Sequence, residues 1–95
     1  MTIFKEKKHW RVFFRRKVEK RVAKMPRTEQ VLFANLIEDL HRKGPIRTEW
    51  KNFSKLSEHE YHCHLSYSWV ACWKVKNEFM EIEVYYAGSR EKAPY

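Results

Sequence analysis

Glycine, cysteine and long apolar runs are all scarce in this sequence. Its 95 residues include 2 glycines, 3 prolines and 2 cysteines. No window approaches the roughly 18 uninterrupted apolar residues that a membrane span needs, and residues 1–8 have no apolar core of the kind found in signal peptides. We therefore expect a cytoplasmic protein with no membrane partner. Two cysteines are too few for a disulfide framework, so Cys63 and Cys72 are expected to be buried free thiols.

Positive charge and aromatic side chains are what the sequence has in abundance. Lys and Arg number 20 against 12 Asp and Glu, which gives a formal net charge of +8, and 16% of the residues are aromatic. This apolar content argues against a disordered chain, and the length predicts a single domain over residues 1–95. In residues 1–27 only Glu6 and Glu19 oppose a long series of Lys and Arg, among them Arg15, Arg16 and Lys20. Such a surplus favours nucleic-acid binding, with a solvated helix face as the alternative.

The first half of the chain predicts a strand and two helices. Residues 10–14 are aromatic and β-branched, and the apolar residues that follow recur at helical spacing. Pro26 is expected to end the first helix, and Thr28 is expected to cap the second. Gly44 and Pro45 form a stop signal after its apolar stripe.

The second half changes to the alternating period of strands. Strands are expected over residues 61–65, 69–75 and 80–86, with turns at residues 66–68 and 76–78. The predicted fold is α+β, with an N-terminal strand and two helices packed on a three- to four-stranded antiparallel sheet. One sheet face is then left for function.

Two histidines share one side of the strand at residues 61–65. Alternation directs His62 and His64 to one face and Cys63 to the other, and we expect both imidazoles to be exposed. Because histidine titrates near neutral pH, such a pair could supply a general base beside a phosphate; solvent-facing histidines without a role are the alternative. A zinc site is disfavoured, because Cys63 faces away and no second ligand pair follows at zinc-finger spacing.

The C-terminal residues add an arginine, a lysine and a tyrosine. The last strand exits at Gly88, directly before Arg90, Lys92 and Tyr95. Arginine grips a phosphate through two hydrogen bonds, and tyrosine stacks on bases or transfers a proton. A frayed tail is the alternative.

These strands, together with the Gly88-Ser89-Arg90 exit and the closing Tyr95, resemble the RelE/ParE superfamily of toxins from bacterial toxin–antitoxin pairs. The resemblance is best over residues 53–95 and is closest to the RelE and HigB type of mRNA interferase. It implies a RelE-like fold and ribosome-dependent cleavage of translated mRNA. It also implies catalytic roles for His62, His64, Arg90 and Tyr95, of which the two histidines lie where such enzymes often carry lysines. One departure is that residues 69–72 read Trp-Val-Ala-Cys where a second phosphate-binding arginine is common.

The mechanism that the resemblance implies is attack of a ribose 2′-OH on the adjacent phosphate, with no metal and no small-molecule cofactor. The expected partners are a cognate antitoxin protein, the ribosome and mRNA. The expected RNA-binding residues are Lys55, Lys92, Arg15, Arg16 and Lys20. Two alternatives stay open: a ParE-like inhibitor of DNA gyrase on the same fold, and a non-catalytic RNA-binding module.

Overall fold

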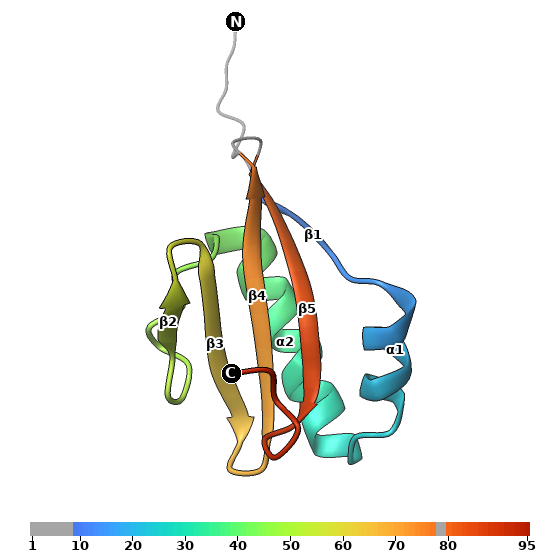
Figure 1. Ribbon diagram of the computed structural model, residues 1–95. Helices are drawn as coiled ribbons and strands as arrows, with labels where there is room; N and C mark the ends of the chain where they lie inside the picture. Colours follow the sequence, from blue (N-terminus) through green and yellow to red (C-terminus); the bar gives the residue numbers. More distant parts are fainter. Residues whose placement is uncertain (1–8, 78–79) are drawn as a thin grey trace, which may run out of the picture.

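The computed structural model describes residues 9–77 and 80–95. Two helices and five strands follow one another in the order strand, two helices, four strands (Figure 1). They are β1 (Arg11–Phe13), α1 (Arg16–Ala23), α2 (Arg27–Lys43), β2 (Ser54–Ser57), β3 (Glu60–Ser66), β4 (Trp69–Asn77) and β5 (Glu81–Ser89). Residues 1–8, with their basic side chains, and Glu78 of an expected turn lie outside the described residues.

All five strands form one sheet in the order β1-β5-β4-β3-β2. Neighbours from β5 to β2 pair antiparallel, whereas β1 pairs parallel to β5. The expectation of three to four antiparallel strands was therefore wrong. The strand expected at residues 10–14 is confirmed as β1, although its parallel pairing with β5 was not predicted. β2 was missed, because its 4 residues are too few to give a clear alternation. Both are recruited as edge strands by backbone hydrogen bonds to their longer neighbours.

Several other boundaries also differ from expectation: β3 is one residue longer at each end, and β5 ends at Ser89 rather than at residue 86. Pro26, rather than Thr28, occupies the N-cap of α2, and its carbonyl accepts from the Gln30 N–H at 3.0 Å. The turn expected at residues 76–78 was wrong at its start, because β4 continues to Asn77. The last strand begins at Glu81 rather than Met80, whose φ of 60° breaks the extended geometry.

Both helices pack on one face of the sheet, as expected (Figure 1). The core between them contains Leu36 and Leu40 of α2, Ile82 and Val84 of β5, and Trp73, all 0% exposed. The Trp73 indole N–H donates to the Pro45 carbonyl at 3.0 Å. The burial of β4 is thereby tied to the end of α2.

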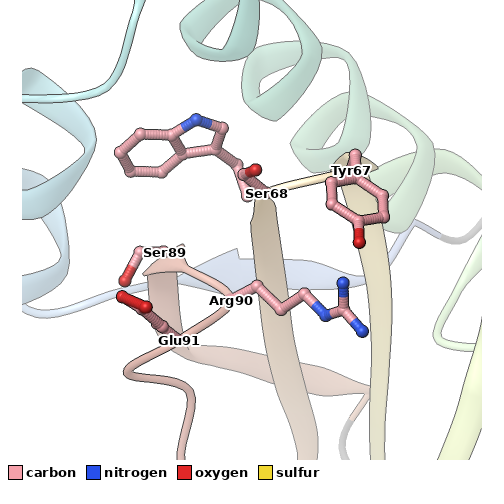
Figure 2. A pocket seen from close by; sticks show the side chains of 6 residues that line it. Tyr67, Ser68, Ser89, Arg90 and Glu91 are labelled. Carbon is pink, nitrogen blue, oxygen red and sulfur yellow. The ribbon is translucent and has the colours of Figure 1, made fainter.

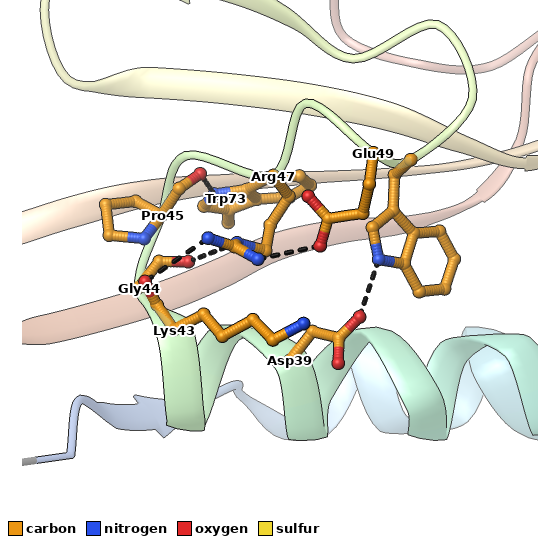
Figure 3. A network of polar contacts seen from close by, with 8 residues as sticks. Asp39, Lys43, Gly44, Pro45, Arg47, Glu49 and Trp73 are labelled. Carbon is orange, nitrogen blue, oxygen red and sulfur yellow. Dashed lines mark hydrogen bonds and ion pairs between the residues drawn. The ribbon is translucent and has the colours of Figure 1, made fainter. Parts of the chain in front are cut away.

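A polar network fixes the connection from α2 to β2 (Figure 3). The Arg47 guanidinium donates to the carbonyls of Gly44 and Lys43 and to the Glu49 carboxylate, at 3.0, 3.3 and 2.7 Å. Arg47 thus satisfies carbonyls that the helix end leaves without partners. The Trp50 indole donates to Asp39 at 2.8 Å. These contacts hold the segment that leads into β2 against the helix.

The sheet face opposite the helices carries a second, smaller cluster of Val70, Cys72 and Tyr86. Ala93 packs against it, so the C-terminal residues return over the sheet, and the chain end lies over β3 (Figure 1). Cys63 and Cys72 are buried free thiols, as expected. Within the described ranges, no helix has the length and apolarity to cross a membrane.

Candidate functional site

His62 and His64 lie on the sheet face opposite the helices, with ring centroids 5.7 Å apart. Their neighbour Cys63 lies in the helix-covered core, so the predicted alternation is confirmed. The expected exposure was wrong, because the imidazole-bearing residues are only 8% and 7% exposed. The tail after β5 covers His62, since the Tyr95 ring lies 4.4 Å from the His62 ring, whereas the Asn52 side chain lies beside His64. Sequence alternation gives the face of a residue but not what later covers that face.

Hydrogen bonds from β2 and the preceding turn orient both imidazoles. The Asn52 amide nitrogen lies 3.4 Å from Nδ1 of His64. In donating to that atom it leaves the His64 proton on Nε2. The Ser54 hydroxyl lies 2.9 Å from Nδ1 of His62 and serves either tautomer, because a hydroxyl both donates and accepts. His62 is therefore able to present an unprotonated Nε2.

Burial and nearby positive charge keep both histidines neutral. Burial lowers the pKa of His62, and the nearby His64 lowers it further, against a smaller opposing effect of a hydrogen bond to the Ser54 backbone. Burial also lowers the pKa of His64, and the charges of Arg90 and Lys51 add to this effect. A neutral imidazole is the form that accepts a proton. The pair thus has the protonation state that a general base requires.

Arg90 extends from the end of β5 toward this pair. Its backbone N–H donates to the Ser68 carbonyl at 2.8 Å, which fixes its Cα at the β3–β4 turn. Its guanidinium carbon lies 5.0 Å from the centre of the Tyr67 ring, and the side chain is directed toward that ring (Figure 2). The same charge lowers the pKa of His64. Arg90 therefore acts on both the turn and His64.

Tyr95 closes the group of predicted catalytic residues. Burial raises the pKa of its hydroxyl, although Arg90 opposes this shift, so the phenol keeps its proton. The residue is still 52% exposed. Arg90 and the two histidines thus have a protonated phenol beside them, and the four predicted catalytic residues are brought together.

A pocket of about 440 Å³ lies next to Arg90. Its lining is aromatic on one part and polar on the rest. Figure 2 shows Ser89 and Glu91 on one side of Arg90 and Tyr67 on the other. The lining residues are Tyr67, Ser68, Trp69, Ser89, Arg90 and Glu91. Of these six residues, only Arg90 was predicted from the sequence as a site residue.

The expected RNA-binding residues are divided between several places. Lys55 pairs with Tyr61, whose ring is in the helix-side core, so alternation directs Lys55 away from the histidines. The Arg15 side chain donates to Glu83 at 3.1 Å. Arg16 and Lys20 lie one turn apart on the exposed side of α1. None of these four contacts the histidine group.

Lys92 lies at a smaller hollow that two cations from α1 and its C-cap also line. Its volume is about 180 Å³, and these cations are Arg21 of α1 and Lys24, which follows the helix. The Arg21 guanidinium carbon lies 5.2 Å from the Tyr86 ring centre. The sequence reading identified the basic segment but not these two members of it, because only packing decides which side of α1 faces the tail.

The sequence reading also missed Lys51, Asn52 and Ser54. Lys51 and Asn52 lie in a short irregular turn, where Asn52 has a φ of 52°, and Ser54 begins the 4-residue strand β2, which is too short to show periodicity. Asparagine tolerates that left-handed conformation better than most residues. Among residues 9–77 and 80–95, no group of three His, Cys, Asp or Glu side chains comes together as metal ligands.

Solved structures with this fold include toxins of two organisms. The archaeal RelE in a RelE–RelB complex from Pyrococcus horikoshii has a TM-score of 0.70 at 16% identity, covering 88% of this chain and 98% of that one. A metal-bound toxin from Helicobacter pylori has a TM-score of 0.67 at 14% identity, covering 87% and 97%. The solution structure of a conserved hypothetical protein from the same bacterium has a TM-score of 0.52 at 14% identity, covering 86% and 96%.

No protein-family model and no curated protein sequence matches the chain. The structural likeness nevertheless extends over nearly the whole of each neighbour. This chain has the RelE-like fold, as the sequence resemblance implied: two helices on one face of a mixed sheet of five strands.

Proposed function

We propose that this protein is the toxin of a toxin–antitoxin pair and cleaves translated mRNA on the ribosome without a metal. The observation that carries the proposal is the convergence of His62, His64, Arg90 and Tyr95 on one face of the sheet. The RelE-like fold supports it, since a fold neighbour is a toxin bound to its antitoxin. Fold alone is compatible with several activities, so the site residues carry the argument.

The chemistry is an internal displacement on one RNA phosphate. His62 donates a hydrogen bond from Nδ1–H to the Ser54 hydroxyl, and its unprotonated Nε2 accepts the proton of the 2′-OH. The 2′ oxygen then bonds to phosphorus as the bond from phosphorus to the 5′ oxygen breaks, which leaves a 2′,3′-cyclic phosphate and a 5′-hydroxyl end. The 2′ oxygen loses one proton and the 5′ oxygen gains one, the bond formed at phosphorus replaces the bond broken there, and no oxidant or cofactor is consumed.

The remaining groups stabilise charge and supply the second proton. Arg90 places a guanidinium fork beside the phosphate, where negative charge develops in the transition state. His64 carries its proton on Nε2 when Asn52 donates to Nδ1, so it hydrogen-bonds a phosphate oxygen. Tyr95, which keeps its proton because burial raises its pKa, donates to the departing 5′ oxygen. RNA reaches His62 after the Tyr95 ring turns away from its tilted contact with the imidazole.

The proposed partners are an antitoxin protein, the ribosome and mRNA. The cations Arg21, Lys24 and Lys92 line one hollow beside the tail, and a phosphate backbone or an acidic antitoxin segment complements them. Binding of an antitoxin over the tail would hide Arg90 from RNA. Antitoxin binding of this kind would inhibit RNA cleavage without any change in the fold of the toxin.

A gyrase-directed activity is the second candidate. It is favoured by Val70 and Cys72 on β4, which are 0% exposed. They lie in the segment where RelE-type enzymes commonly carry a second phosphate-binding arginine. A toxin that needs no RNA site would tolerate both this loss and the buried imidazoles.

Inducible expression in bacteria separates the two candidates. We expect growth arrest, with cuts inside translated messages and 5′-hydroxyl ends, and no arrest from the Arg90→Ala variant. Growth arrest with intact messages and blocked DNA supercoiling would overturn the nuclease proposal in favour of gyrase. The matched control is Arg42→Ala, an exposed cation of α2 that pairs with Glu38 at 3.6 Å.

A further inference from the structure

We infer that the pocket beside Arg90 binds one nucleobase of the RNA and that guanine is the base it fits best. The inference rests on the proposed RNA cleavage and extends it to substrate choice. The pocket has a volume of about 440 Å³, which accommodates one purine ring together with water. Aromatic rings, a carboxylate and hydroxyl groups line it together. Proteins recognise single-stranded bases through this combination of stacking and hydrogen bonding.

The aromatic part of the pocket offers a stacking surface. Tyr67 lies at the β3–β4 turn and is 76% exposed, although a large ring is ordinarily buried. The Arg90 guanidinium lies over this ring, 5.0 Å from its centre, and limits its motion. Trp69 also lines the pocket while it packs against the core. A ring held in place stacks on a base with little further loss of conformational entropy.

The polar part of the pocket matches one base edge. Ser89 Oγ accepts from the Lys92 backbone N–H at 3.3 Å, which leaves the Ser89 hydroxyl proton to donate. The Glu91 carboxylate accepts two hydrogen bonds and donates none. One donor beside two acceptors complements the Watson–Crick edge of guanine, which presents a carbonyl oxygen followed by two N–H donors. Adenine presents an acceptor where guanine has its ring N–H, so the carboxylate repels it.

The pocket is placed to act in the same reaction. Arg90 lines it, and Tyr67 directly follows β3, the strand that carries His64. A phosphate held between Arg90 and His64 therefore has its attached nucleotide within reach of Tyr67. Base recognition then decides which phosphate is presented to the histidines.

The first test measures base binding without cleavage. The purified full chain is titrated with GMP, AMP, CMP and UMP and followed by NMR, so that all probes carry the same phosphate. We expect GMP to bind most tightly, Tyr67→Ala to weaken GMP binding by about tenfold or more, and Tyr67→Phe to keep it. Glu91→Gln should reduce GMP binding to the level of AMP. Both side chains are exposed, and the matched control Glu58→Gln, on an exposed turn residue, should change nothing.

The second test maps cleavage. In the parent we expect guanine at a fixed position relative to the cuts, and in Glu91→Gln we expect cutting to continue with that preference lost. Equal binding of the four nucleotides, or GMP binding that survives Tyr67→Ala, overturns the base site even if cleavage occurs. GMP binding that depends on Tyr67 and Glu91 in a protein that cuts no message supports the base site while the proposed nuclease function fails.

Discussion

Arg90 combines a fixed backbone with an exposed side chain. Its N–H is bonded to the β3–β4 turn, so the guanidinium starts from a defined point and needs little reorganisation to meet a phosphate. A charge held in this way contributes more to the transition state than to binding.

We therefore expect Arg90→Ala to lower the rate of mRNA cleavage by about 100-fold or more, the usual effect of removing one preorganised stabilising group. Arg90→Lys should restore only part of the rate, because an ammonium group keeps the charge but loses the planar fork. Single-turnover cleavage on programmed ribosomes gives both rates. Cleavage at the parental rate by the alanine variant would remove Arg90 from the mechanism.

His62 and His64 couple stability to pH. The folded state lowers both pKa values below the ordinary 6.5, so the unfolded chain binds protons more readily. The stability contributed by the neutral imidazoles is thus complete above that value and is lost as the pH falls through the folded-state pKa values.

A protein with both histidines changed to glutamine should consequently lose less thermal stability between about pH 7 and about pH 5 than the parent does. Melting followed by circular dichroism at the two pH values measures the difference. His59→Gln, at an exposed position of the β2–β3 turn, is the control and should retain the parental pH dependence. Equal losses in the parent and the double variant would contradict neutral buried imidazoles.

Among the helices and strands, the length of a strand decided how much of it the sequence predicted. β3 alternates in sequence over 7 residues, and its two faces follow from the sequence, as do its boundaries to within one residue at each end. β2 is too short for periodicity, and the parallel pairing of β1 depends on hydrogen bonds to a strand distant in sequence. β2 matters for function because it supplies Ser54, and the turn before it supplies Asn52. The sequence thus identified the histidines without the residues that orient them.

The end of α2 offers a test of an element boundary. Gly44 has a φ of 93°, and a Cβ built there would lie 2.8 Å from the Trp10 indole nitrogen. Gly44→Ala should therefore lower the free energy of unfolding by about 1–3 kcal/mol, the usual cost of a residue forced into such a conformation. Urea denaturation measures it. Thr48→Ala, at an exposed position in the same connection, should be close to neutral, and an unchanged Gly44→Ala midpoint would show that this turn is not constrained.

For the whole molecule, the two sheet faces have different roles. One is filled by the helices, and the other carries the histidines under a tail that ends in Tyr95. The net charge of +8 adds a long-range attraction for RNA, and Arg21, Lys24 and Lys92 concentrate part of it beside the tail.

The affinity for single-stranded RNA should therefore fall at least about tenfold between about 50 mM and about 200 mM salt, because each neutralised phosphate releases counterions. Fluorescence anisotropy with a labelled RNA measures the slope. Replacing Arg21 and Lys24 by glutamine should reduce the slope, whereas replacing Arg42 and Lys43 on α2 should leave it nearly unchanged. A slope that does not respond to the first pair would move the RNA-binding surface away from this hollow.

The sequence by itself determined the class of fold, the order of its main elements and the four residues proposed for catalysis. These follow from local causes: apolar periodicity, the stop at Gly44, alternation in β3, and the resemblance over residues 53–95. Only the tertiary structure decided that β1 joins β5, that the tail buries His62, and that Tyr67 and Glu91 line a pocket with Arg90. Those contacts join residues far apart in the chain, and no local pattern encodes which distant backbone or side chain will be the partner.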